Sequence, residues 1–215
     1  MSILNSFDKI KQEIEKNSTS KKTQIIAISK TFPLDHVKPL VDYGHDHFGE
    51  NKVQEAEQKW GQLIKAKPDL NLHMVGRLQS NKAKKAVEIF NYIHSLDSEK
   101  LAKELEKREK QINKKLKYFI QVNLGSESQK GGIEINNLKN FYNFCVQKTS
   151  LSIVGLMAIP PNDNQPDKYF EQISDLNNEL GLTQLSIGMS NDYKQALKYN
   201  STFIRIGSAI FGNRN

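Results

Sequence analysis

Hydrophobic and polar positions follow two different periods along the chain. Short apolar runs of strand length alternate with longer stretches in which apolar residues recur at every third or fourth position, the spacing of one helical face. Residues 24–29 (QIIAIS) are the clearest short run, and Leu138, Phe141, Tyr142 and Cys145 form a clear helical stripe. The pattern predicts strands that alternate with helices, and it predicts that Cys145 is a small core residue.

The predicted strands are spread over the whole chain, and a helical stretch follows each of them. We expect strands at residues 24–29, 46–49, 72–75, 92–94, 117–122, 153–157, 184–187 and 203–206. We expect helices around residues 33–43, 53–63, 81 onward, 97–112 with Asp97 as the cap, 138–145, 169–180 and 192–199, and a short one after the last strand. The stripe of Ile3, Phe7, Ile10 and Ile14 predicts one further helix before the first strand.

Strand–helix units with short connections build a parallel sheet, and eight of them close a (β/α)8 TIM barrel. A single barrel of this kind, with an extra N-terminal helix, is the predicted fold. A doubly wound open sheet is the alternative, because weak runs such as residues 46–49 are easily miscounted. No linker or low-complexity tract divides the sequence, and the proline-rich residues 159–166 are typical of a loop after a strand. Residues 1–215 are therefore predicted to form one domain.

Composition restricts the class of protein. The 215 residues are 37% hydrophobic and 26% charged, which is ordinary for a globular protein. The lone cysteine excludes a disulfide framework and a cysteine-rich metal site. The N-terminal residues lack the apolar core of a secretory signal, and no stretch approaches the roughly 18 apolar residues of a membrane span. We therefore expect a cytoplasmic protein without a membrane partner.

The net charge of +7 raises the question of a nucleic-acid partner. The lysines are scattered, however, and acidic residues are mixed among them. The sequence shows no signature of a helix-turn-helix, RRM or KH module. A solvated basic surface is the favoured interpretation, and a basic RNA-binding protein is the less favoured one. We expect no nucleic-acid partner.

Lys30 ends the first predicted strand and is a candidate for covalent chemistry. The functional face of a β/α barrel lies at the carboxyl ends of its strands. Strand alternation puts Lys30 on the same face as Ile26 and Ile28, so its side chain is expected to point into the barrel mouth. A desolvated lysine loses its proton more readily and forms Schiff bases with aldehydes. On position alone, a lysine that merely reaches solvent is the simpler interpretation.

Two turns after the last two predicted strands favour a phosphate site. Residues 205–212 (RIGSAIFG) predict a strand, then Gly207 and Ser208, then a short helix. A glycine allows close backbone approach, and a hydroxyl and free N–H groups donate to phosphate oxygens. Ser190 follows the seventh predicted strand, and TIM barrels often bind phosphate at the loops after strands seven and eight. An ordinary helix cap is the simpler interpretation of either turn by itself.

The histidines give weaker signals. His45 and His47 share one side of an extended segment, but no third ligand accompanies them, so a metal site is not favoured. His73 and His94 lie in apolar strands, which is typical of hydrogen-bonded core residues. The sequence has no nucleophile elbow, Walker motif or dinucleotide-binding fingerprint.

Several segments match one known family, in the same order and nearly from end to end. They are residues 28–31 (ISKT), 48–51 (FGEN) with Gln54 and Glu55, 73–82 (HMVGRLQSNK), 121–123 (QVN) with Glu127, Lys130 and Gly132, 155–157 (GLM), 186–190 (SIGMS) with Asp192, and 205–212 (RIGSAIFG). By these segments the chain resembles the pyridoxal 5′-phosphate (PLP) homeostasis proteins, a family related to the barrel domain of alanine racemase. The shared order and spacing make the resemblance specific.

The resemblance implies a PLP site on a barrel of PLP fold type III. The cofactor-binding residues that it implies are Lys30 as the covalent aldimine, Ser190, Gly207 and Ser208 at the phosphate, Arg205 at the pyridine nitrogen, and Asn51, His73 and Met189 along the pocket. Members of the family usually have threonine at the position of Ser208, and the serine keeps the hydroxyl group. Lys130 is a candidate for a second amine or phosphate contact.

The resemblance also bears on catalysis. An arginine donates only and stays protonated, so it leaves the ring nitrogen unprotonated and weakens PLP as an electron sink. Alanine racemase also uses a tyrosine from a second domain, and with the sequence ending at Asn215 we expect no such domain. A PLP carrier or buffer without turnover is therefore expected, a monomer that serves apo-enzymes in vitamin B6 and amino-acid homeostasis. A PLP-dependent amino-acid racemase is the alternative.

Overall fold

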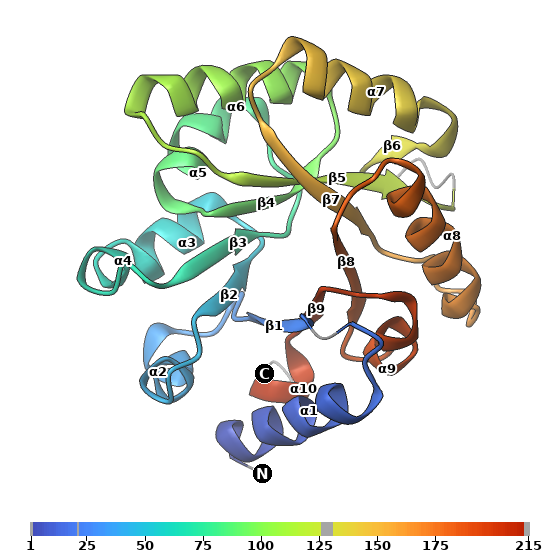
Figure 1. Ribbon diagram of the computed structural model, residues 1–215. Helices are drawn as coiled ribbons and strands as arrows, with labels where there is room; N and C mark the ends of the chain where they lie inside the picture. The colour runs from blue at the N-terminus through green and yellow to red at the C-terminus, as the bar shows by residue number, and fades with distance from the viewer. Residues whose placement is uncertain (1, 21, 126–130, 213–215) are drawn as a thin grey trace.

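Parallel strands surround the centre of the molecule, and helices lie outside them (Figure 1). The computed structural model describes residues 2–20, 22–125 and 131–212. Within these residues, eight strands form a closed barrel: β1 (Gln24–Ile28), β2 (His47–Glu50), β3 (Asn71–Met74), β4 (Tyr92–Leu96), β5 (Lys117–Asn123), β7 (Ser152–Ala158), β8 (Gln184–Met189) and β9 (Phe203–Ile206). A two-residue strand that the sequence did not predict, β6 (Ile133–Glu134), pairs with β5 without joining the ring.

Two pairings close the barrel. The first and last strands lie side by side, because β1 pairs with β9 and places Gln24 opposite Phe203 and Ala27 opposite Ile206. The strands β4 and β5 also pair in parallel. An open sheet would leave two unpaired edges, whereas here the row of strands returns to its start. The predicted (β/α)8 barrel is confirmed, and the doubly wound alternative is wrong.

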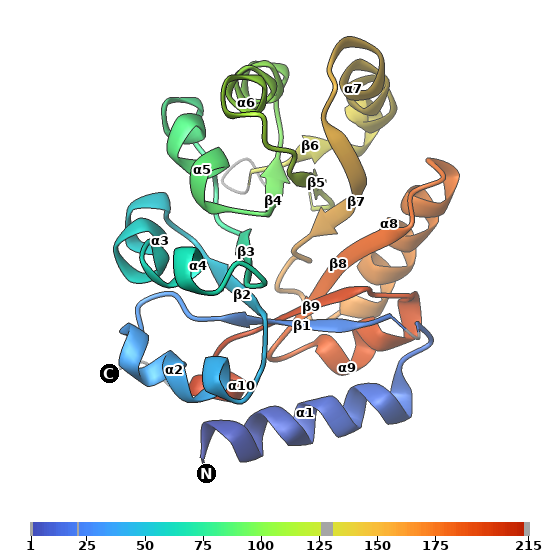
Figure 2. The same ribbon diagram turned by 60° about the vertical axis from the view of Figure 1, so that its left-hand side comes forward.

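The helices follow the predicted alternation. They are α1 (Ile3–Asn17), α2 (Leu34–Asp42), α3 (Val53–Trp60), α4 (Leu63–Ala66), α5 (Ala83–Ile89), α6 (Glu99–Ile112), α7 (Ile135–Lys148), α8 (Pro166–Glu179), α9 (Tyr193–Ala196) and α10 (Ser208–Phe211), with 3-10 turns η1 (Ser80–Lys82) and η2 (Leu197–Tyr199). The predicted N-terminal helix is present, and it lies beside α10 in both ribbon views (Figures 1 and 2). None of the described helices has the length and apolar character that a membrane crossing requires.

The start of α6 differs from the prediction. The N-cap is Ser98, whose Oγ accepts a hydrogen bond from the backbone N–H of Leu101 at 3.3 Å. The prediction of Asp97 as the cap is therefore wrong. Both residue types cap helices well, but the chain turns helical one residue later than predicted, so only the serine hydroxyl reaches a free N–H group.

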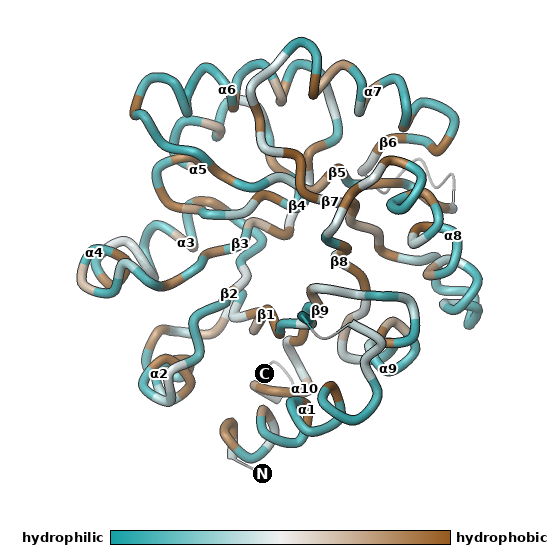
Figure 3. The backbone as a smooth tube through the Cα atoms, in the orientation of Figure 1, coloured by the Kyte–Doolittle hydropathy of each residue, from teal (hydrophilic) through white to brown (hydrophobic). Residues whose placement is uncertain are grey.

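Apolar side chains pack on both faces of the barrel wall. A large core fills the space between strands and helices, and a smaller cluster fills the barrel interior: Ile26, Ile28, Tyr92, Phe119, Met157 and Phe203. Hydrophobic residues accordingly follow the strands, while the outer helix surfaces are hydrophilic (Figure 3). Cys145 is fully buried in α7, and burial raises the pKa of its thiol to about 12, which confirms the predicted core position.

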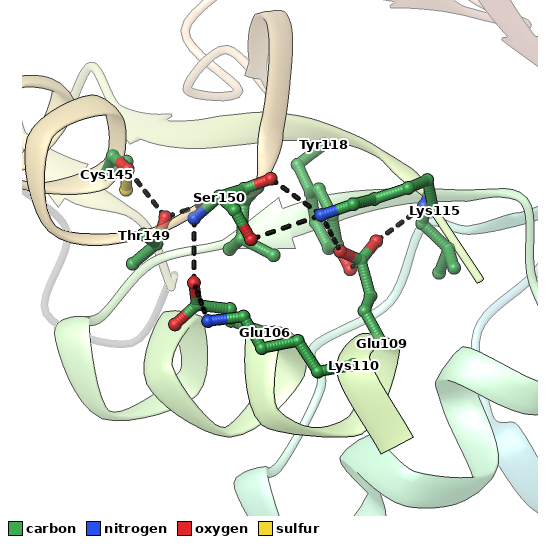
Figure 4. Close-up of polar contacts among 10 residues, drawn as sticks. Glu106, Glu109, Lys110, Lys115, Tyr118, Cys145, Thr149 and Ser150 are labelled. Atoms are coloured by element: carbon green, nitrogen blue, oxygen red, sulfur yellow. Dashed lines mark hydrogen bonds and ion pairs between the residues drawn. The ribbon is translucent and has the colours of Figure 1, made fainter. Parts of the chain in front are cut away.

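A polar network braces the amino-terminal ends of β5 and β7 (Figure 4). The buried carboxylate of Glu109 in α6 accepts hydrogen bonds from the backbone N–H of Leu116 and the hydroxyl of Tyr118. Burial and this carboxylate both raise the pKa of Tyr118. Glu106 lies one turn earlier in α6. Its Oε1 accepts a hydrogen bond at 2.9 Å from the backbone N–H of Ser150, which lies just before β7. The network is structural, and it leaves the carboxyl ends of the strands for a functional site.

Candidate cofactor site

A cavity of about 1010 Å³ lies at the carboxyl ends of the strands. This volume is at the upper end of the roughly 300–1,000 Å³ that ligand pockets occupy. Its walls hold seven of the eight predicted site residues: Lys30, Asn51, Met189, Ser190, Arg205, Gly207 and Ser208. The eighth, His73, does not line the cavity. It is fully buried in the barrel interior, so its predicted place along the pocket is wrong.

Lys30 follows β1 by two residues and lines the cavity. Ile26 and Ile28, which share its face of the strand, belong to the interior cluster, so the predicted inward direction is confirmed. Thr31, the next residue, has φ = 69°. This left-handed conformation is unfavourable for a β-branched residue. The chain therefore turns sharply away from the barrel directly after Lys30.

A buried ion pair supports the backbone next to Lys30. Glu50 ends β2 and is fully buried, and its Oε1 accepts hydrogen bonds from Lys59 Nζ at 2.8 Å and from Trp60 Nε1 at 2.9 Å. The hydroxyl of Ser29 donates to the same oxygen at 2.7 Å, and Lys59 also donates to the Ser29 carbonyl at 2.6 Å. The residue before Lys30 is thus held through both its side chain and its backbone.

The turns after β8 and β9 meet at the hydroxyl of Ser190. The backbone N–H groups of Gly207 and Ala209 point at Ser190 Oγ, at 3.3 and 3.5 Å. The backbone of Gly207 lies beside β1, since a Cβ atom on this residue would be 3.4 Å from the Ile28 carbonyl, an ordinary contact distance. Two N–H donors and the Ser190 hydroxyl therefore converge beside Ser208, as an anion such as phosphate requires.

Arg205 lies in β9 and is 5% exposed. Its Nη1 donates to the carbonyl and to the hydroxyl of Ser186, at 2.7 and 2.8 Å, and its Nη2 donates to the Ala158 carbonyl at 2.9 Å. Burial lowers the pKa of Arg205 to about 10, and Asp192 partly opposes this shift. The guanidinium therefore stays charged at neutral pH.

Three histidines occupy the barrel interior below Arg205. His94 contacts Ser186, His73 contacts His94, and His47 contacts His73, each through a ring nitrogen at 2.8–2.9 Å. Burial lowers the pKa of His73 and of His94 well below its usual range. The prediction that His73 and His94 are hydrogen-bonded core residues is confirmed.

Sequence reasoning missed part of the site. The cavity is also lined by a loop after β7 and by the turn after β8 with the helix α9 that follows it: Ile159, Pro160, Pro161, Asn162, Asn164, Asn191, Asp192 and Gln195. The proline-rich composition of residues 159–166 predicted a long loop, and its place after a barrel strand was the signal that it borders the site.

Lys130, the predicted second amine, lies outside the described residues. Within the described part of the chain, no group of three or more His, Cys, Asp or Glu side chains is arranged to hold a metal ion.

Unfolding is expected to become easier as the pH falls below about 6.5. The unfolded chain then binds protons at His73 and His94 that the folded chain, with its lowered pKa values, does not bind. Each histidine should lower the free energy of unfolding by on the order of 1 kcal/mol between pH 7.5 and 5.5. Urea unfolding at these pH values measures the change, and a His73→Gln variant should show a shallower pH dependence. An equal dependence in the variant would contradict this assignment.

The fold and the cavity together define a parallel β/α barrel with a ligand cavity at the carboxyl ends of its strands. The family model described as alanine racemase, N-terminal domain, matches residues 6–215. A pyridoxal phosphate homeostasis protein of Aquifex aeolicus is 36% identical over 200 residues, covering 89% of this chain and 87% of that protein. One from Schizosaccharomyces pombe is 34% identical and covers 100% of this chain and 94% of that protein. The chain belongs to the family of the pyridoxal phosphate homeostasis proteins.

Solved structures agree with this assignment. PipY of Synechococcus elongatus, solved without PLP, superimposes with a TM-score of 0.89 at 34% identity and covers 98% of this chain and 100% of that one. The same protein solved with PLP bound gives a TM-score of 0.88 at 33% identity, with the same coverage. The family predicted from the sequence segments is confirmed.

Proposed function

We propose that this protein binds PLP at Lys30 and carries or buffers it without turnover, in vitamin B6 and amino-acid homeostasis. One observation carries the proposal: a single cavity holds a strand-end lysine, a buried arginine and the convergent donors of Ser190 and Gly207. The PLP-bound structure of PipY supports it.

The residues present fit the cofactor. Lys30 supplies the amine that bonds the aldehyde carbon, and Ser190, Gly207 and Ser208 supply hydroxyl and N–H donors for the phosphate. Arg205 supplies a donor for the ring nitrogen, while Asn51 and Met189 line the cavity. Gly207 belongs to the cradle because its backbone N–H points at Ser190 Oγ, at 3.3 Å.

Arg205 also favours a carrier over an enzyme. Bound PLP supplies an electron sink for amino-acid chemistry, and the sink is strongest when the ring nitrogen is protonated. A guanidinium is a donor only, so a hydrogen bond from Arg205 requires the unprotonated nitrogen. The arginine thus holds the proton away from the ring and mutes carbanion chemistry.

The setting of this activity is also part of the proposal. We infer that the chain acts as a monomer and as one domain over residues 1–215. It works in the cytoplasm, where apo-enzymes that need PLP receive the cofactor from it. The names of the curated relatives, which describe homeostasis and no reaction, support this role.

The test is an absorption spectrum of the purified protein before and after borohydride. A visible band that borohydride removes, with the reduced adduct mapped to the peptide of Lys30, is expected. Incubation with an apo-enzyme should restore that enzyme's activity and decrease the band. Absence of both band and adduct would refute PLP binding. Sustained conversion of any member of a panel of L- and D-amino acids would replace the carrier with a PLP-dependent racemase or another enzyme.

A further inference from the structure

A continuous line of hydrogen bonds runs through the barrel from the cavity toward its opposite end. Arg205 Nη1 lies 2.8 Å from Ser186 Oγ, which lies 2.9 Å from His94 Nδ1. His94 Nε2 lies 2.9 Å from His73 Nδ1, and His73 Nε2 lies 2.8 Å from His47 Nδ1. All five side chains belong to residues that are at most 6% exposed. We call Ser186, His94, His73 and His47 the histidine relay.

The relay consists of groups that can each donate one proton and accept another. A neutral imidazole has one N–H and one bare nitrogen, and a serine hydroxyl has one hydrogen. Burial lowers the pKa of His73 and His94, and the charge of Arg205 lowers that of His94 further, so both rings are neutral near pH 7. The hydrogen bonds can therefore run in only two directions along the line.

Arg205 selects one of these directions. Because the guanidinium only donates, Ser186 Oγ accepts from it. The Ser186 hydroxyl hydrogen then has His94 Nδ1 as its acceptor, the remaining partner of this oxygen among the described residues. His94 in turn donates from Nε2 to His73, and His73 donates from Nε2 to His47. In the reverse direction Oγ would accept from two N–H groups, and its own hydrogen would lack that acceptor.

This direction matters for the geometry of Arg205. Its contacts to the Ser186 carbonyl, the Ser186 hydroxyl and the Ala158 carbonyl use three of the five N–H groups of a guanidinium. The remaining donors belong to a residue that lines the cavity. When the Ser186 hydroxyl donates its hydrogen to His94, its lone pairs stay available to accept from Arg205 Nη1. The relay thereby holds the guanidinium plane in one orientation.

We propose that the histidine relay positions Arg205 as a donor toward the ring nitrogen of PLP, with Ser186, His94 and His73 as positioning residues. The inference rests on the proposed function. The charged and titratable groups that face the line are Asp192 at the cavity end and His45, Asp46 and Lys117 at the His47 end. The middle of the line is enclosed by aromatic rings, with Phe119 stacked on His94 and Tyr92 on His73.

The direction of the relay can be measured in the wild-type protein without cofactor. Nitrogen-15 NMR of the imidazole rings distinguishes the two neutral forms and the charged form. We expect His94 and His73 to carry their proton on Nε2 between pH 6 and 8. A proton on Nδ1 of either ring, or a charged ring in this range, would overturn the inference.

Variants test the effect on the cofactor. Ser186→Ala and His94→Phe should raise the dissociation constant of PLP about 3–10-fold, the effect of losing one hydrogen bond that positions a charged group. Their absorption band should also become pH-dependent between pH 5.5 and 8, because a loosened guanidinium no longer keeps protons from the ring nitrogen. Ser186→Thr, which restores the hydroxyl, should recover both properties.

Ser95→Ala is the matched control. Like Ser186, Ser95 is a buried serine of a barrel strand, here β4, and it directly follows His94, but its Oγ has no hydrogen-bond partner among the described residues. This variant should bind PLP and absorb light as the wild type does. If Ser186→Ala behaves like Ser95→Ala while the wild type keeps its reducible band, the relay inference is wrong and PLP binding stands. If the wild type itself lacks the band, the proposed function fails, and the NMR result still decides the direction of the relay.

Discussion

Lys30→Ala protein is expected to purify without the visible band and without a borohydride-trapped adduct. Lys30 is the lysine that lines the cavity among the described residues, and alanine removes the amine that we propose bonds the aldehyde carbon. The donors proposed for the phosphate, at Ser190 and Ser208, remain in this variant, so weak and reversible PLP binding should persist. Absorption spectra and mass spectrometry of the reduced protein measure the loss, which should be complete.

Lys52→Ala is the control for this variant. Lys52 lies just after Asn51 at the same end of the barrel, but its side chain is 70% exposed and pairs with Glu55. The band and the adduct should therefore be unchanged. A reduced adduct that persists in Lys30→Ala would show that another amine holds the cofactor, and the assignment of Lys30 would have to be abandoned.

Lys59→Met is expected to lower the free energy of unfolding by about 3–5 kcal/mol. The side chain of Lys59 is 9% exposed and that of Glu50 is fully buried, so methionine would leave a carboxylate without its counter-charge. The loss should be large because, within the part of the chain that the structure describes, Glu50 Oε2 has no hydrogen-bond partner and Oε1 receives all three donors. Urea unfolding at pH 7 provides the measurement.

Two comparisons separate this effect from the loss of any lysine. Lys38→Met breaks the exposed pair with Asp42 and should cost at most about 1 kcal/mol. Adding Glu50→Gln to Lys59→Met removes the unpaired charge, while the amide oxygen can still accept from Ser29 and Trp60. The double variant should be more stable than Lys59→Met, and the opposite order would show that charge is not the cause.

The fold could be predicted because a closed parallel barrel buries both faces of its strands. Such strands have short apolar runs, and the run at residues 24–29 placed β1 to within one residue of its end. The weak run at 46–49 was shifted by one residue from β2, since a strand of four residues leaves little periodicity to read. The two residues of β6 carry no periodicity, so their pairing with β5 could not be predicted.

Most of the site could be predicted by asking which polar residues follow a strand. This rule gave Lys30, Ser190 and Ser208, and the resemblance added Arg205. His73 was placed along the pocket by the family resemblance, and a matching segment does not give the depth of a side chain along the barrel axis. Depth depends on the register between strands, which places His73 opposite Gly49 and Tyr92 in the interior. The ion pair of Glu50 with Lys59 was missed because it joins a strand to the following helix, and the period of either element does not show which side chains meet between them.

The pairing of β1 with β9 brings together two proposed attachment points that lie far apart in the sequence. Lys30 follows the first strand, and residues 207–208 follow the last, so a ligand held by both fastens the seam where the barrel closes. Thermodynamic linkage then makes unzipping of that seam and departure of the ligand mutually dependent. A ligand present at 100 times its dissociation constant would add about 2.7 kcal/mol to the closed form. Loosening only the pairing of β1 with β9 would therefore allow the protein to release bound PLP while the other strands stay paired.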